Sequence, residues 1–181
     1  MKDVFRKAWF VTSKPVAFAN ALEEQPQERR AIGSGVAASL LAAAHLALYW
    51  ALATGSTWWL VVLLVAPLGA ALAWLVQAGL GALVLLRPGG LGALAYPLLA
   101  WSFVPSAVVT VSLWPAALLD AQAAFVASVV MLPLVHVRWL ALALSGVQVA
   151  KPVMTLALYV LVTLVGPLAL IVWILEAFAS V

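Results

Sequence analysis

The sequence contains no cysteine, and only 8% of its 181 residues are charged. Without cysteine the chain can form no disulfide, no thiolate nucleophile and no cysteine-ligated metal site. Globular domains carry about 25% charged residues, so this low charge, together with 67% hydrophobic residues, excludes a soluble domain. The two histidines have no carboxylate at ligand spacing, and we therefore expect neither a metal nor another cofactor.

Charge is missing altogether between Ala31 and Leu86. Crossing about 30 Å of hydrocarbon takes roughly 20 apolar residues. This stretch therefore supplies two crossings, one on each side of the turn Thr54-Gly55-Ser56. Three more apolar stretches follow it. The predicted fold class is all-α: a polytopic integral membrane protein with five transmembrane helices in one bundle, preceded by a short amphipathic helix. The predicted spans are residues 31–53, 57–86, 91–113, 122–148 and 152–175.

The first 30 residues form a separate cytoplasmic, basic segment, and residues 31–181 form the transmembrane domain. Ala51-Leu52-Ala53 resembles a signal-peptidase site. A signal peptide, however, has a short basic region before about 7 to 15 apolar residues, whereas a long polar segment precedes the apolar run here. We therefore expect the first span to be retained.

The third predicted span contains prolines. Pro97 and Pro105 lie inside it and Pro115 just beyond it. Because proline removes a backbone hydrogen bond and kinks a helix, and the freed carbonyls need partners in a membrane, we expect this span to be bent and buried. Residues 114–121, which include Asp120, are predicted to form the next turn.

The distribution of basic residues predicts the orientation. Five spans with a cytoplasmic N-terminus and an extracytoplasmic C-terminus leave no lysine or arginine on the outer side, as the positive-inside rule requires. Because the cations are spread along the chain at the ends of the predicted helices, they do not indicate a nucleic-acid partner. We expect a location in a prokaryotic cell membrane. The outer ends carry an aromatic belt of Tyr49, Trp50, Trp58, Trp59, Trp114, Trp173 and Phe178.

Residues 1–14 show the pattern of a short amphipathic helix. Phe5 and Trp9 lie at i and i+4, while Arg6 and Lys7 contribute to a basic face. Such a helix suits the headgroup region of an anionic leaflet. The alternative is a disordered basic tail. Pro15 ends this helix, and a second short helical piece leads towards Glu24.

Polar side chains within the spans are candidates for function, because they are costly in hydrocarbon. The candidates are His45, Gln77, His136 and Arg138. His136 and Arg138 are two positions apart, about 200° around a helix, so they cannot share a face. Arg138 could simply reach cytoplasmic headgroups or helix carbonyls, or it could bind a lipid or another anion. No catalytic motif accompanies these residues, so no catalytic residue is assigned and we expect a non-enzymatic protein.

The order of these features resembles the Yip1 domain family. The resemblance rests on the acidic pair Glu23-Glu24, Trp139, the step from Gln148 to Pro152, and several short motifs. It implies five helices with a cytoplasmic N-terminus. Eukaryotic members of that family act in vesicle trafficking and bind small GTPases or membrane proteins. This sequence does not show their long N-terminal region, so it resembles the short prokaryotic members. The resemblance therefore gives no support for GTPase binding. The short motifs are Lys14-Pro15-Val16-Ala17-Phe18, Arg87-Pro88-Gly89-Gly90-Leu91-Gly92, Ala95-Tyr96 and Phe103-Val104-Pro105.

The leading functional hypothesis is therefore a non-enzymatic membrane protein that organises lipids or partner membrane proteins. Its expected partners are anionic lipid headgroups at the cytoplasmic face and either another membrane protein or further copies of itself. The alternative is a small permease, channel or lipid scramblase subunit. In that case proline-broken helices would surround a polar path formed by His45, Gln77, His136 and Arg138.

Overall fold

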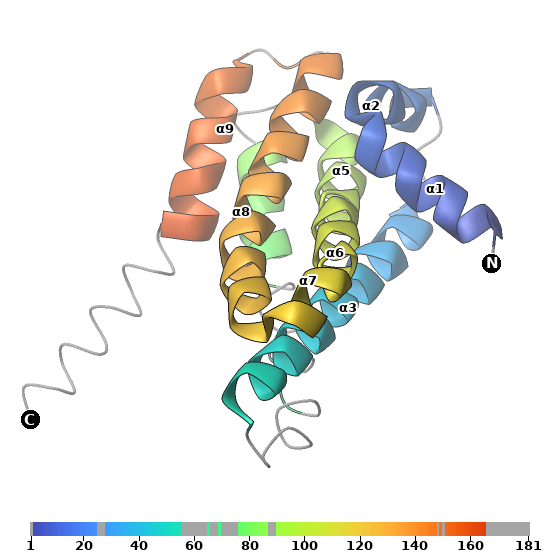
Figure 1. The fold of residues 1–181 in the computed structure, drawn as a ribbon. Helices are drawn as coiled ribbons and strands as arrows, with labels where there is room; N and C mark the ends of the chain where they lie inside the picture. Colours follow the sequence, from blue (N-terminus) through green and yellow to red (C-terminus); the bar gives the residue numbers. More distant parts are fainter. Residues whose placement is uncertain are drawn as a thin grey trace, which may run out of the picture.

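The computed structural model describes residues 2–24, 28–55, 65, 69, 76–86, 90–147, 149 and 151–165; of residues 2–5 and 28–30 it describes the backbone alone. The described residues form helices and no strand (Figure 1). Several predicted features lie outside these residues: most of the span 57–86, the turn at Arg87-Pro88-Gly89, Gln148, and residues 166–181.

Among the described residues, three helical stretches are long and apolar enough to cross a membrane. The first is the apolar part, Ala31–Thr54, of α3 (Glu28–Thr54). The second runs over Gly92–Leu119, and the third is α8 (Ala121–Gly146). Two shorter apolar helices, Val76–Leu86 and Pro152–Val165, accompany them. The latter consists of α9 (Pro152–Val160) and the π-helical turn η2 (Leu161–Val165).

The stretch Gly92–Leu119 is broken into consecutive pieces. The chain leaves regular helix at Ser102 and again at Leu113. Pro105 has no N–H to offer the carbonyl four residues earlier, and its ring crowds that carbonyl. The helix is thus interrupted within this span, and the expected burial is confirmed, because 39% of the most apolar part of this stretch is buried, against 22% in each of the other two. The pieces are η1 (Gly92–Leu94), α5 (Ala95–Trp101), α6 (Phe103–Ser112) and α7 (Trp114–Leu119).

The prediction of a turn over residues 114–121 is wrong. Residues Trp114–Leu119 form α7, with Pro115 in its first turn, where a missing N–H costs nothing. The turn itself is confined to Asp120, whose backbone is extended (φ −148°, ψ 96°). The Asp120 carboxylate accepts a hydrogen bond from the N–H of Ala123 at 2.9 Å and so caps the start of α8.

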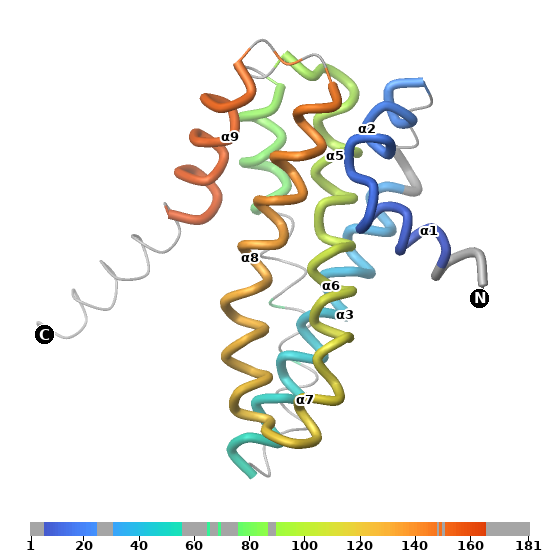
Figure 2. Tube along the Cα trace, turned by 45° about the horizontal axis from the view of Figure 1, so that its top comes forward, coloured from blue at the N-terminus to red at the C-terminus, as the bar shows by residue number. Residues whose placement is uncertain are grey.

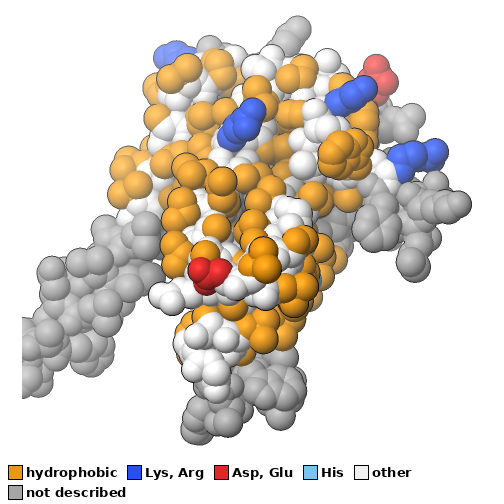
Figure 3. Space-filling model, viewed as in Figure 1, with side chains coloured by type: hydrophobic (Ala, Val, Ile, Leu, Met, Phe, Trp, Pro, Cys, Tyr) orange, Lys and Arg blue, Asp and Glu red, His pale blue; other side chains and the backbone are white. Residues whose placement is uncertain are grey.

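The helices form one bundle whose ends differ in charge. α8 runs antiparallel to α3 and to the α5–α6–α7 stretch, and α9 returns beside α8 (Figures 1 and 2). Helix α2, the start of α5, the end of α8 and the start of α9 therefore gather at the upper end in Figure 2, and α1 lies beside the middle of the bundle. On the face drawn in Figure 3, lysine and arginine side chains lie over the upper half together with one acidic side chain, and another acidic side chain lies in the lower half.

Two short N-terminal helices pack against the side of this bundle. We call α1 (Lys2–Ser13) and α2 (Pro15–Glu24) together the N-terminal cap. Helix α1 confirms the expected helix and excludes the disordered tail over these residues. The cap buries a stripe of residues with helical spacing, which are Val11, Pro15, Phe18, Ala19 and Leu22.

The cap is attached to the bundle by aromatic side chains. The indole Nε1 of Trp139 on α8 donates a hydrogen bond to the Val11 carbonyl at 2.6 Å. The Phe18 ring lies 5.2 Å from that of Trp101 and 6.2 Å from that of Trp139, between centroids. At the end of α8, Gly146 allows close approach of α2, because a Cβ there would lie 2.9 Å from a methyl group of Val16.

Candidate functional site

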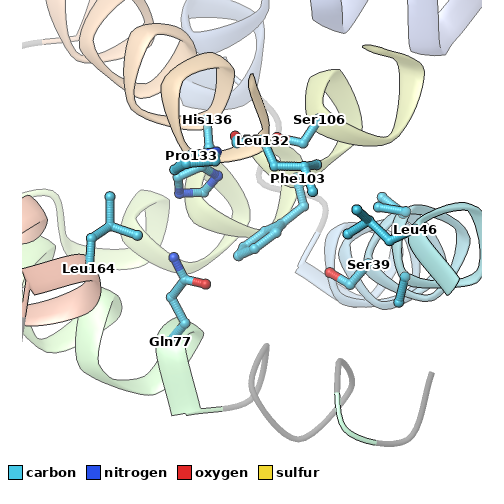
Figure 4. Close-up of a pocket in the computed structure, with 12 residues that line it drawn as sticks. Ser39, Leu46, Gln77, Phe103, Ser106, Leu132, Pro133, His136 and Leu164 are labelled. Atoms are coloured by element: carbon cyan, nitrogen blue, oxygen red, sulfur yellow. Dashed lines mark hydrogen bonds between the residues drawn. The ribbon is translucent and has the colours of Figure 1, made fainter. Parts of the chain in front are cut away.

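A pocket of about 280 Å³ opens between the helices of the bundle (Figure 4). It lies between α3, the helix Val76–Leu86, α6, α8 and η2. Its wall is mainly apolar, with four polar side chains among the described lining residues and no charged one. The lining residues are Ala38, Ser39, Ala42, Ala43, Leu46, Gln77, Phe103, Ser106, Leu132, Pro133, His136 and Leu164.

His136 is the most buried polar side chain of this wall, with 3% of its surface exposed. Its Nδ1 lies 3.3 Å from the carbonyl oxygen of Ser102, and its Nε2 lies 2.5 Å from the hydroxyl oxygen of Tyr159. A carbonyl oxygen can only accept, so Nδ1 carries the proton and donates it to Ser102. Nε2 then accepts the hydrogen bond that the Tyr159 hydroxyl donates. The geometry thus fixes the tautomer of a neutral imidazole.

Gln77 faces this arrangement from the opposite side of the pocket. A directed chain of hydrogen bonds runs from Tyr159 through His136 to the backbone of Ser102. In Figure 4 the Gln77 amide points across the pocket towards His136.

Tyr159 is held in place from two directions. Its side chain is fully buried, and its ring packs so closely on the helix Val76–Leu86 that a Cβ at Gly81 would lie 2.7 Å from its Cε2 atom. The π-helical turn η2 follows Tyr159 at once, and the hydroxyl of Thr163 in that turn donates to the Tyr159 carbonyl at 2.7 Å. Single π-helical turns recur at functional sites.

The two serines of the wall use their protons on backbone carbonyls. Ser39 donates to the carbonyl of Gly35 at 2.9 Å, and Ser106 donates to the carbonyl of Leu132 at 3.2 Å. A hydroxyl group has one proton and two lone pairs. Each serine oxygen can therefore still accept a hydrogen bond but has no proton left to donate.

The structure brings together two of the four polar residues predicted within the spans. Gln77 and His136 line the same pocket, whereas His45 and Arg138 do not. His45, on α3, directs Nδ1 to its own helix, 2.8 Å from the Leu41 carbonyl, and its ring lies 6.0 Å from that of Trp114. Arg138 is exposed on α8. Within the described part of the chain, no group of three or more histidine, aspartate or glutamate side chains could hold a metal ion.

The residues predicted for the membrane-surface helix lie on α1. Trp9 is 68% exposed, and Arg6 is exposed as well. Lys7 is also exposed, but its Nζ lies 4.6 Å from the centre of the Trp101 ring, a cation–π contact with the bundle. The side chain of Phe5 lies outside the described residues.

Sequence reasoning missed Tyr159 and the two pocket serines. Tyr159 lies seven residues beyond Pro152, about 10 Å along the helix and thus away from the membrane interface where tyrosine usually lies. Its position away from the interface is the feature of the sequence that could have identified Tyr159. Ser39 and Ser106 gave no signal, because serines commonly bond to the carbonyl four residues earlier in their own helix.

The all-helical structure, with three helices long and apolar enough to span a bilayer, is consistent with a multi-pass membrane protein. The polar pocket described above has no charged side chain among its described lining residues and lies between the helices. Comparisons of the chain with protein-family models, with characterised proteins and with solved structures found no match.

Proposed function

We propose that the chain is a five-span, non-enzymatic, Yip1-like membrane protein that organises lipids or partner membrane proteins. In this proposal the N-terminal cap lies at the cytoplasmic leaflet and binds anionic headgroups there. The cap is the observation that carries the proposal, because a fixed basic helix with exposed aromatic rings is the arrangement that binds a lipid surface.

The two faces of α1 support this role. Val11 is fully buried against the bundle, while Trp9 and Phe10 are 68% and 37% exposed. Tryptophan favours the headgroup region, where its ring meets apolar chains and its N–H meets water. Arg6 on α1 and Lys14 after it are exposed near these rings in the sequence, and each basic residue near an anionic leaflet contributes about 1 kcal/mol of attraction.

The arrangement of the helix ends supports the proposed orientation. Helix α2 of the cap, the start of α5 and the end of α8 lie at one end of the bundle (Figure 2). Lys151 precedes α9 at this same end, whereas Asp120 caps α8 at the other. With this end in the cytoplasm the positive-inside rule is obeyed.

Native mass spectrometry of the full chain in detergent tests lipid binding by the cap. We expect phosphatidylglycerol to bind in preference to phosphatidylcholine, and the double variant Arg6→Gln/Lys14→Gln to lose that preference. The matched control is Lys151→Gln, which removes an exposed cation that lies outside the cap and should leave the preference intact. An unchanged preference in the double variant, or its loss only in the control, would contradict the proposal.

Gentle purification from the native membrane tests the partner. A second protein present in stoichiometric amount would support the scaffold role and identify its pathway. Recovery of the chain with lipid alone would argue against a stable protein partner.

A permease, channel or scramblase subunit is the second candidate. The observation that favours it is the shared pocket of Gln77 and His136. The proposed polar path, however, would need His45 and Arg138 as well, and these lie apart from that pocket. Unchanged flux through vesicles containing Gln77→Leu/His136→Leu would exclude a path through the pocket.

A further inference from the structure

We propose that the pocket between α3, α6 and α8 binds an uncharged apolar molecule that carries a hydroxyl group, a long-chain alcohol in chemical class. This inference does not rest on the proposed role of the cap, which lies outside the pocket. It rests on which hydrogen-bonding groups of the pocket are already used and which are left.

The lack of charged side chains among the described residues of the wall favours a neutral ligand. No lysine, arginine, aspartate or glutamate is among the described residues of the pocket. An ionised ligand would therefore lose its hydration without gaining a counter-ion, and burial of an unpaired charge is the most costly kind. This argument disfavours carboxylates, phosphates and amines.

The remaining hydrogen-bonding groups select a ligand that both donates and accepts. The oxygens of Ser39 and Ser106 can only accept, because their protons are bonded to the carbonyls of Gly35 and Leu132. Gln77 brings amide N–H donors and an amide oxygen to the wall. A ketone or an ester could use only the Gln77 donor. A hydroxyl group can donate to a serine oxygen or to the Gln77 oxygen, and it can also accept from the Gln77 amide.

The hydrogen-bond chain behind the wall keeps His136 in place. Both ring nitrogens of His136 are occupied, by Ser102 and Tyr159, so the imidazole does not compete for the ligand. The two bonds fix its ring as a preformed part of the wall, which reduces the cost of binding.

The size and lining of the pocket suit an apolar body. A volume of about 280 Å³ equals the share of liquid volume of roughly nine water molecules. Most of the wall is alanine, leucine and phenylalanine, which offer water few partners. Water would be poorly held there, whereas part of an alkyl chain gains contact with every side of the wall.

Photolabelling of the full chain in phosphatidylcholine nanodiscs tests the inference. The probes are decanol, decane and decanoic acid, each with a diazirine on the same carbon. We expect the alcohol alone to label pocket residues, and unlabelled decanol to compete in a saturable way. Equal labelling by decane would show an acyl-chain site, equal labelling by decanoic acid would show no selection for a neutral ligand, and no labelling would show no site; each overturns the proposal.

Variants separate the polar contact from the shape of the pocket. Gln77→Leu should weaken competition by decanol about fivefold, the effect of one lost hydrogen bond. Gln122→Leu is the matched control, since Gln122 is exposed on α8 outside the pocket. Ala42→Phe should block labelling by filling the space. Unchanged competition by decanol in the Gln77→Leu variant overturns the inference, even if Ala42→Phe fails to fold. The lipid preference of the cap is measured separately, so the proposed function can fail without affecting this result.

Discussion

Tyr159 donates a hydrogen bond of 2.5 Å to Nε2 of His136, across 23 positions of sequence and between two helices. Both side chains are buried, and their rings are stacked with centroids 5.7 Å apart. The bond fastens α9 to α8 at the level of the pocket. It also leaves each of the two ring nitrogens of His136 with one partner.

Replacing Tyr159 by phenylalanine should destabilise the fold by about 1 kcal/mol, because the buried Nε2 of His136 loses its donor. We would measure this by unfolding the protein in mixed micelles of increasing dodecyl sulfate. Tyr96→Phe, a half-buried tyrosine on α5, is the control and should have little effect. A double-mutant cycle with His136→Leu should show coupling of about 0.6 to 1.7 kcal/mol; additive effects would mean that the bond contributes nothing.

Two glycines of the same helix should respond in opposite directions to alanine. A Cβ at Gly81 would lie 2.7 Å from Tyr159 and 3.0 Å from Leu99, whereas a Cβ at Gly79 would meet nothing within 4 Å. We expect Gly81→Ala to cost about 1 to 3 kcal/mol through overpacking. Gly79→Ala should stabilise by up to about 1 kcal/mol, through the higher helix propensity of alanine. The same micelle unfolding measures both, and equal effects would contradict the described packing.

Loss of the indole N–H at Trp139 should release the N-terminal cap. Trp139→Phe keeps an aromatic ring but removes the hydrogen bond to the Val11 carbonyl. We expect faster proteolysis within residues 2–24, followed by mass spectrometry. Trp114→Phe is the control, because Trp114 lies on α7 and packs on Tyr49 and His45 rather than on the cap. Equal cleavage of both variants would refute the role of the Trp139 bond.

Removing the cap of α8 should weaken the lower end of the bundle. Asp120→Ala deletes the acceptor of the Ala123 N–H, at a cost of about 0.5 to 2 kcal/mol. Asp120→Asn retains a side-chain oxygen and should recover most of the stability. Hydrogen exchange at Ala123 gives a local measurement, and protection that survives in Asp120→Ala would show that the backbone does not need this acceptor.

Local features of the sequence predicted much of the fold. The absence of charge predicted α3, and the prolines at 97 and 105 predicted that the third span is not one regular helix, as its interruption at Ser102 shows. The angle between His136 and Arg138 correctly implied that only one faces inwards. These inferences succeeded because hydropathy and proline act within a few residues of chain. The predicted turn over residues 114–121 was wrong for an equally local reason, since Pro115 is compatible with the first turn of a helix and α7 begins there.

The pocket could not be derived in the same way. The bond between His136 and Tyr159 depends on the register between two helices, which packing sets and hydropathy does not encode. Gln77 and His136 were chosen as polar groups in apolar spans, but so were His45 and Arg138, and nothing local distinguished the pairs. The stripe from Val11 to Leu22 was different: its helical spacing crosses Pro15 and could have predicted that the cap packs on the bundle.

The bond between Trp139 and Val11 joins residues 128 positions apart, which has a consequence for synthesis. A ribosome adds about 5 to 20 residues per second, so α1 must wait many seconds after it emerges before its partner exists. During that interval the aromatic stripe of the cap has no bundle on which to pack. Docking of the cap thus marks the completion of α8, and a chain that stops short of it would keep its N-terminal helices open to chaperones and proteases.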